Sequence, residues 1–320
     1  MGSIDLKDAY YSIPVHPEHQ KYLKFVWDNK LYQFTSLAHG LACVPRLFTK
    51  VMKPVFVTLR GKGHPSSGYL DDTFLVGYSY DECQSNINDT LKLLKDLGFG
   101  TNQDISVLKP THVLQHLGFI LNSEEMSVTI SGEKIEKLKE IANTVLGSFR
   151  VQIRLVAKLI GHMVSCFPAV EYAELFYQEL ETGMYKTLAL KETKGNFDAL
   201  MTLSDRARSD FKWWIANFQI SKKAISHGKI DFTMYTDAST IGWGATLGQT
   251  TTGGRWSPEE KEYHINYSEL KATLLGLQSL CSASTECHIK VLTDNTTAVA
   301  YICHMGGSHS IPFNDMAREI

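Results

Sequence analysis

The chain has 320 residues, of which 43% are hydrophobic and 21% charged. This composition is that of a globular protein and excludes a disordered or collagen-like chain, and the length allows two or three domains. The formal net charge of −2 lacks the basic footprint that nucleic-acid-binding domains usually carry, although a local basic groove is compatible with it.

The sequence also predicts where the protein works. No apolar run reaches the length that spans a bilayer, and the N-terminus has no basic-then-apolar signal pattern, so we expect no membrane partner. The six cysteines include no Cys-x-x-Cys pair, which is typical of reduced thiols rather than of a disulfide framework or a zinc site. We therefore expect an intracellular protein of the cytoplasm, the nucleus or both.

The first 60 residues predict a strand, a hairpin and a helix. Residues 3–6 predict a strand that carries Asp5 among apolar neighbours, where an acid is costly without a partner; a turn-capping Asp is the alternative. Residues 23–34 predict a hairpin. A loop at residues 37–41 is followed by Pro45, which suits the first turn of a helix.

Two adjacent acids, Asp71 and Asp72, follow Tyr69 and Leu70 between two short β-type runs. This pattern predicts a tight hairpin with acid at its tip. Like charges side by side are costly unless solvent screens them or a cation lies between them. The stretch is therefore either a solvated Asp-Asp turn or part of a divalent-metal site.

The following residues complete an α+β domain over residues 1–128. Residues 81–97 predict an amphipathic helix that Gly98 ends. Residues 101–108 predict a strand, and residues 114–121 one arm of a second hairpin.

Residues 129–229 predict a mostly helical domain with helices from residue 131, over 150–167 and over 192–218, and a linker at 221–229. Its basic side chains could follow a phosphate backbone, and a solvated helix face is the alternative. These residues are Lys134, Lys137, Lys139, Arg150, Arg154 and Lys158.

Residues 230–320 predict a third domain of strands and helices. The expected strands are 231–239, 242–247, 254–257 and 288–295, and the expected helices are 266–280 and 296–304. Asp237 and Asp294 lie toward the ends of two strands, and Glu269 lies in the first turn of a helix. Three carboxylates that can converge suit Mg²⁺, which takes carboxylates, waters and substrate phosphate.

These residues resemble a known family in two places. The first domain resembles the palm of a reverse transcriptase, and the last resembles a ribonuclease H domain. The run SIDLKDAYY at 3–11 and the run GHMVSCFPAV at 161–170 are similar to DIRS-type (tyrosine-recombinase) retrotransposons. The resemblance implies an α+β palm without its fingers, a helical thumb or connection, and an α/β ribonuclease H-like domain truncated at its C-terminus.

The resemblance implies roles for individual residues of the palm. Asp5 and Asp71 match its two metal-binding catalytic aspartates, and Asp72 matches the neighbouring acid. Tyr10 matches the ring that crowds a ribose 2′-hydroxyl, so it would favour deoxynucleotides. Two further residues are implied to bind substrate, Tyr69 in the acidic box and Gly40 in the loop under the incoming nucleotide.

In the last domain, Asp237, Glu269 and Asp294 match the first three catalytic, metal-binding acids of ribonuclease H. The implied cofactors are two Mg²⁺ ions per active site, with Mn²⁺ as a substitute. The implied activity is a nucleotidyltransferase with an endonuclease domain, and the implied partners are an RNA template, a DNA primer, deoxynucleotides and an RNA–DNA hybrid. A catalytically inactive fragment that only binds nucleic acid and a nuclease without polymerase activity are the alternatives.

The sequence departs from this family at four places. It begins just before Asp5, so the fingers are expected to be missing, and it ends before a fourth ribonuclease H acid. Ile105 stands where the family usually has a lysine thought to protonate pyrophosphate. His39 stands where the family usually has Phe or Gln.

Overall fold

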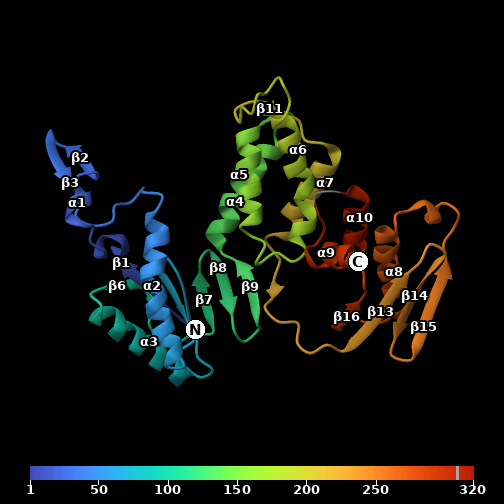
Figure 1. The fold of residues 1–320 in the computed structure, drawn as a ribbon, viewed down its shortest axis with the longest axis horizontal. Coiled ribbons are helices and arrows are strands. Elements are labelled where there is room, and N and C mark those ends of the chain that lie inside the picture. Colours follow the sequence, from blue (N-terminus) through green and yellow to red (C-terminus); the bar gives the residue numbers. More distant parts are fainter. Residues whose placement is uncertain (308–309) are drawn as a thin grey trace. The chain divides into compact units, whose positions relative to one another are not determined.

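A computed structural model describes residues 1–307 and 310–320 (Figure 1). The chain divides into two compact units, an N-terminal unit of Met1–Glu125 and a C-terminal unit of Met126–Ile320. The expected division into three domains, after residues 128 and 229, stays a prediction. Within the described residues, no helix is both long and apolar enough to cross a membrane.

The N-terminal unit is built on an antiparallel sheet of order β4-β5-β1-β6 with helices against one face. Side chains alternate along these strands, so that Ile4, Leu6 and Leu75 enter a core with residues of both helices. The elements are β1 (Gly2–Lys7), α2 (Val44–Gly61), β4 (Ser66–Tyr69), β5 (Asp72–Leu75), α3 (Tyr80–Asp96) and β6 (Gly100–Val107).

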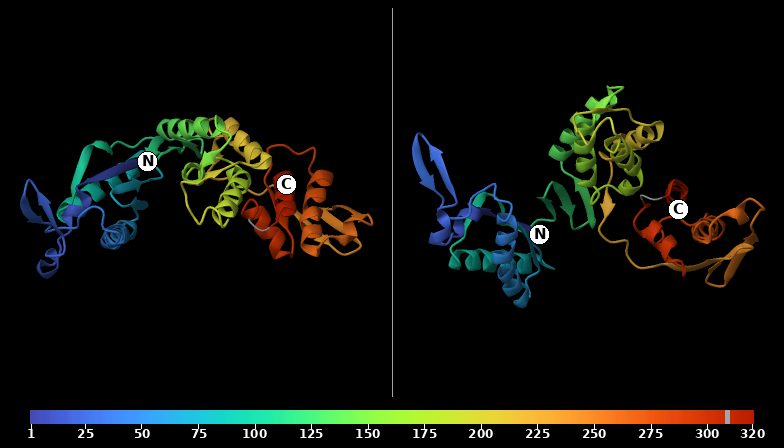
Figure 2. Two further views of the ribbon diagram at one scale, coloured as in Figure 1. Left: turned by 90° about the horizontal axis from the view of Figure 1, so that it is seen from above. Right: turned by 45° about the horizontal axis from the view of Figure 1, so that its top comes forward.

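Two hairpins complete this unit. The predicted hairpin at 23–34 is confirmed as β2 (Lys24–Trp27) and β3 (Lys30–Gln33), and both strands are exposed along their length. It stands apart from the rest of the unit in both views of Figure 2. The second hairpin corrects the prediction of a single arm at 114–121, because Leu117 and Gly118 adopt positive φ and turn the chain. Four elements complete the unit: η1 (Ala9–Ser12), α1 (Pro17–Gln20), β7 (Val113–His116) and β8 (Phe119–Asn122).

The C-terminal unit begins with a helical part. The prediction of one helix over 192–218 is wrong in its first half, since Lys194 and Gly195 have positive φ and the Thr193 hydroxyl donates to the Leu190 carbonyl. The helix begins only after Ser204, whose side chain accepts from the Ala207 N–H. The helical elements are α4 (Gly132–Leu146), α5 (Ile153–Val164), η2 (Ala173–Phe176), α6 (Gln178–Leu188) and α7 (Asp205–Asn217). Short strands accompany them: β9 (Ser127–Ile130), β10 (Val151–Gln152), β11 (Leu200–Met201) and β12 (Lys223–Ala224), which lies inside the expected linker.

The rest of this unit is a sheet of order β15-β14-β13-β16, in which β13 and β16 run parallel (Figure 1). The third strand begins earlier than predicted, because its residues from Thr250 onward pair with β14 across a tight turn. The strands are β13 (Phe232–Ala238), β14 (Gly242–Leu247), β15 (Thr250–Arg255) and β16 (Ile289–Leu292). The helices are η3 (Glu260–Glu262), α8 (Ile265–Leu280), α9 (Thr296–Cys303) and α10 (Ile311–Glu319).

Helix α10, which the sequence did not predict, ties this sheet region to the helical part. Arg318 donates to the carboxylate of Asp210 on α7 at 2.8 Å and to the carbonyl of Leu175, and its guanidinium lies 4.8 Å from the centre of the Phe176 ring. Asp210 is only 2% exposed, so the pair is a largely buried one. Helix α10 also packs on α8 and α9.

Candidate functional site

Three acids of the N-terminal unit, Asp5, Asp71 and Asp72, form a first acid set. Because Ile4 and Leu6 point into the core, Asp5 points to the open face of the sheet, and Asp72 on β5 is its direct Cα partner. A bulge in β6 opposite Asp5 shifts the register, and the Ser106 hydroxyl there accepts from the Asp5 N–H at 3.0 Å.

Asp71 lies in the turn between β4 and β5. Tyr69 pairs with Asp72, so Leu70 and Asp71 form a two-residue loop, and Leu70 adopts a left-handed φ of 56° that a bulky residue rarely takes. The Asp71 carbonyl accepts from the Leu6 N–H at 3.0 Å and holds the loop against β1. Tyr69 itself is 60% exposed beside the acids.

The charge of Asp71 disfavours ionisation of both Asp5 and Asp72. Burial raises the pKa of Asp5, the charges of Asp71 and Asp72 raise it further, and a hydrogen bond from Asn102 opposes the shift. Burial and the charge of Asp71 likewise raise the pKa of Asp72, while His116 lowers it. A bound cation would remove this repulsion, and the all-oxygen donor set fits Mg²⁺ or Mn²⁺.

A pocket of about 210 Å³ adjoins these acids on the open face of the sheet. Asp5 and Asp72 line it together with Ile105 from the bulge and His116 from the second hairpin. The His116 ring stacks on Phe74 with ring centroids 5.2 Å apart. Sequence reasoning gave His116 no role, although a lone imidazole in the apolar run before Leu117 was a usable signal.

Of the two predicted substrate residues Tyr10 and Gly40, Tyr10 lies close enough to the first acid set to interact with the charge of Asp71. Tyr10 is half-buried on η1, and burial, followed by the charges of Asp71 and Tyr69, raises its pKa. Gly40 has a φ of 89°, and a Cβ there would meet nothing within 4 Å, so the residue serves the turn before α2 and leaves open space above it.

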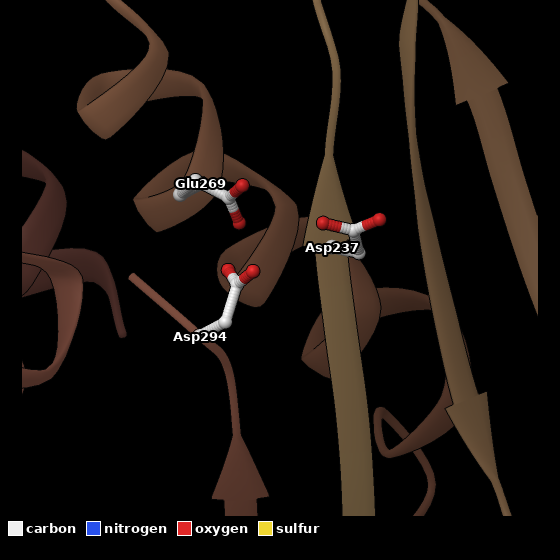
Figure 3. Close-up of side chains that lie close together, drawn as sticks. All are labelled: Asp237, Glu269 and Asp294. Atoms are coloured by element: carbon white, nitrogen blue, oxygen red, sulfur yellow. The ribbon is translucent and has the colours of Figure 1, made fainter. Parts of the chain in front are cut away.

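Asp237, Glu269 and Asp294 form a second acid set, drawn from three elements (Figure 3). Asp237 lies near the end of β13, and Asp294 lies two residues past the end of β16. Because these strands are parallel neighbours, their ends meet at one edge of the sheet. The three carboxylates point toward one another in Figure 3.

Helix α8 supplies the third acid through its packing face. Glu269 shares that face with Thr273, whose hydroxyl lies 3.2 Å from that of Thr236 on β13, and with Gly276, which packs on Met234. The prediction that Glu269 lies in the first helical turn is wrong, because α8 begins at Ile265 and has no acid in its first turn. His264 caps the helix instead and accepts from the Asn266 N–H.

The second acid set also fits a hard cation. Each residue offers one oxygen, and these oxygens lie within 4.8 Å of one another. No other group of three or more acids, histidines or cysteines in the described residues is as closely spaced. Glu269 is 4% exposed and its Oε2 has no hydrogen-bond partner there. Burial raises the pKa of Glu269, and the charges of Asp237 and Asp294 add to the shift. A groove of about 610 Å³ along the sheet reaches Asp237 and Asp294.

The basic residues of the helical part divide into paired and unpaired groups. Arg154 forms two hydrogen bonds to Asp198, Lys139 pairs with Glu136, and Lys134 donates to the Ser165 carbonyl. Lys137 and Lys158 are exposed, and both lower the pKa of nearby His162, after burial as the main cause. A phosphate-binding surface would therefore centre on these last residues and not on the whole row.

Comparison with known proteins identifies the N-terminal unit. Residues 1–121 match the sequence profile of the family "Reverse transcriptase (RNA-dependent DNA polymerase)". The chain therefore contains a reverse transcriptase domain.

Two curated polyproteins resemble the chain. It is 28% identical over 190 residues to the Gag-Pol polyprotein of Avian reticuloendotheliosis virus, a match that covers 56% of this chain and 16% of the relative. It is 22% identical over 334 residues to a polyprotein of Cassava vein mosaic virus that is described as enzymatic, covering 98% of this chain and 48% of the relative. The chain thus spans less than half the length of these relatives.

Solved structures share the fold. The foamy viral protease-reverse transcriptase in complex with RNA/DNA hybrid matches 99% of this chain and 42% of its own, with a TM-score of 0.54 and 15% identity. The same viral protein in complex with dsDNA matches 91% of this chain and 58% of its own, with a TM-score of 0.55. At this identity the likeness establishes the fold alone.

Proposed function

We propose that this chain is the RNA-directed DNA polymerase and ribonuclease H region of a retrotransposon, closest to the DIRS type. The observation that carries the proposal is the presence of two separate acid sets, one on a reverse transcriptase sheet and one where two parallel strand ends meet a helix. The runs at residues 3–11 and 161–170 support the DIRS-type origin. The expected place of action is the cytoplasm or the nucleus.

In the proposed polymerase, Asp5, Asp71 and Asp72 hold two Mg²⁺ ions, which Mn²⁺ can replace. When bound, these ions supply charge neutralisation for the transfer of a nucleotidyl group to the primer 3′-hydroxyl. Tyr10 restricts the sugar, while Tyr69 and Gly40 line the space for template, primer and deoxynucleotide. Ile105 carries no proton to donate, so this chain would rely on water or on His116 for the leaving pyrophosphate.

In the proposed nuclease, Asp237, Glu269 and Asp294 would hold the metal ions, which would supply an activated water for hydrolysis of the RNA strand of an RNA–DNA hybrid. The buried Glu269 is fixed by the packing of α8 and cannot swing into solvent, so it keeps the set preorganised. The RNA 2′-hydroxyl is the group that distinguishes the two strands.

A nuclease without polymerase activity is the second candidate. Its support is the geometry of the second acid set, whose ligand oxygens lie within 4.8 Å of one another, a grouping that the first acid set does not form among the described residues. A fragment that only binds nucleic acid remains the third alternative.

Paired assays separate these candidates. We expect Mg²⁺-dependent primer extension on an RNA template and cleavage of an RNA–DNA hybrid. Asp71→Asn should lower extension by about 100-fold or more and leave cleavage within about twofold, and Asp294→Asn should do the reverse. Cleavage without extension in the wild type would favour the nuclease, and hybrid binding without either activity would favour the inactive fragment.

A further inference from the structure

His39 lies between two tyrosine rings next to the first acid set. Its ring centroid is 5.0 Å from that of Tyr10 and 5.1 Å from that of Tyr11. His39 is exposed, so burial does not explain why the loop brings it there. The contacts of the His39 ring with the rings of Tyr10 and Tyr11 hold it in place instead.

The loop that carries His39 is anchored on both sides. Leu37 and Ala38, just before it, are 8% and 5% exposed, and the Leu37 N–H donates to the Ile13 carbonyl at 3.0 Å. Gly40, just after it, takes a φ of 89° and turns the chain toward α2. These neighbours hold the backbone at His39 in place, and a residue needs a fixed backbone if it is to position another residue.

Tyr10, by contrast, has a weak backbone support. It lies on the four-residue helix η1, whose N-cap Asp8 is left-handed and makes no side-chain cap. The core side of its ring meets Phe48 at 5.4 Å in an edge-on contact. One side of Tyr10 thus packs against the core that contains Phe48, and His39 is a ring that contacts Tyr10 from outside this core.

We propose that His39 is a positioning residue that sets the discrimination between deoxynucleotides and ribonucleotides by holding the Tyr10 ring over the sugar site. The inference rests on the proposed polymerase function. A single 2′-hydroxyl separates the two substrates, so a displacement of the ring by about 1 Å would admit the larger sugar. His39 touches Tyr10 in this scheme and need not touch the nucleotide.

The same contacts extend away from the acids to the exposed hairpin. Tyr11, on the other side of His39, stacks on Phe34 at 6.3 Å, and Phe34 lies 4.8 Å from Phe25 on β2. His39 therefore lies in the middle of a row of ring contacts that runs from Tyr10 to the exposed β2–β3 hairpin. Removing the His39 ring breaks this row at its centre.

The test compares His39→Ala, which removes the ring, with His39→Phe, which keeps one. Extension by dNTPs and by rNTPs is measured in single turnovers, with Asp71→Asn as the inactive control. We expect His39→Ala to lower the dNTP-to-rNTP ratio of kcat/KM by about tenfold, mainly through faster rNTP use, and His39→Phe to stay within about twofold of the wild type.

A second measurement does not require activity. Fluorotyrosine placed at position 10 reports the ring environment by ¹⁹F NMR, and its resonance should shift in His39→Ala far more than in His39→Phe. Normal extension with an unchanged ratio and an unchanged resonance in His39→Ala would overturn the inference alone. Wild-type protein that extends no primer would overturn the selectivity role together with the proposed polymerase.

Discussion

The two acid sets are assembled in opposite ways. The first comes from one antiparallel sheet and includes two residues adjacent in sequence, while the second comes from two parallel strand ends and a helix. Neighbours in a strand point to opposite faces, so Asp72 shares the face of Asp5 through the register, and Asp71 reaches it only from the turn. Of the two sets, only the second brings three carboxylate oxygens within 4.8 Å of one another among the described residues.

The difference extends to what supports each set. The first acid set depends on one hairpin and on the bulge that faces it. The second depends on the packing of α8 on the sheet and, farther away, on the contacts of α10 with α7. Mutations that affect one kind of support should leave the other set intact.

The largest expected effect on stability is that of Arg318→Ala. It leaves Asp210 buried without its partner, which should lower the free energy of unfolding of the C-terminal unit by about 3 kcal/mol. Chemical denaturation, with unfolding monitored by the loss of hybrid-cleavage activity, measures this change in free energy. Arg154→Ala is the matched control, because its partner Asp198 is exposed and solvent screens the pair, so the loss should be much smaller than in Arg318→Ala.

Adding Asp210→Asn to Arg318→Ala should restore part of the loss, since the neutral side chain no longer leaves a charge buried. Equal destabilisation by Arg318→Ala and Arg154→Ala would contradict the role assigned to α10. Primer extension should be unchanged in Arg318→Ala and in Arg154→Ala at temperatures where the C-terminal unit stays folded.

Two glycines offer a smaller test of the same comparison. A Cβ at Gly68 would lie 2.1 Å from Cζ of the buried Phe56, so Gly68→Ala should cost about 2 kcal/mol and reduce extension. A Cβ at Gly276 would lie 2.8 Å from the Ala245 Cβ, but alanine also favours the helix, so Gly276→Ala should cost only about 1 kcal/mol and reduce cleavage. Each variant should spare the other activity, and losses of both activities in either would show that the sets are not independent.

The sequence predicted those parts of the fold that alternation and local turns determine. Residues 23–34 formed the predicted hairpin because Asp28 and Asn29 take the positive φ that its turn needs. The acidic box at 69–72 also formed its predicted hairpin, although Leu70 has to take a left-handed φ there. The convergence of Asp237, Glu269 and Asp294 followed from the order of strands and helix, which fixes parallel neighbours without any long-range detail.

The sequence did not predict the contacts between residues that lie far apart along the chain. Helix α10 has a clear apolar face, but its attachment depends on Arg318 meeting Asp210, 108 residues away. Likewise, the ring contacts of His39 with Tyr10 and of His116 with Phe74 join residues that lie far apart in the sequence, which no local pattern predicts. The false helix over 192–204 has a local cause, a turn at Gly195 that helical periodicity alone did not exclude.

The smallest expected effect concerns the burial of charge in metal-free protein. Glu269 is buried and its pKa is raised above the usual 4.5, so the folded state holds the proton more tightly than the unfolded state. Stability therefore falls as pH rises from about 4.5 through the folded pKa, and Glu269→Gln removes this loss. In EDTA at pH 7 the variant should melt about 2 °C higher than the wild type, and the gain should vanish below the unfolded pKa.

Asp71→Asn is the matched change in the first acid set. Asp71 is exposed in its turn, so the same measurement should give a change of less than about 1 °C. Adding Mg²⁺ should then raise the melting temperature of the wild type more than that of Glu269→Gln, because a ligand stabilises only the state that binds it. A Glu269→Gln variant that melts lower than the wild type in EDTA would contradict this account. It would mean that hydrogen bonds stabilise the second acid set and that repulsion between its carboxylates does not destabilise it. Repulsion would then not explain why the set binds a cation.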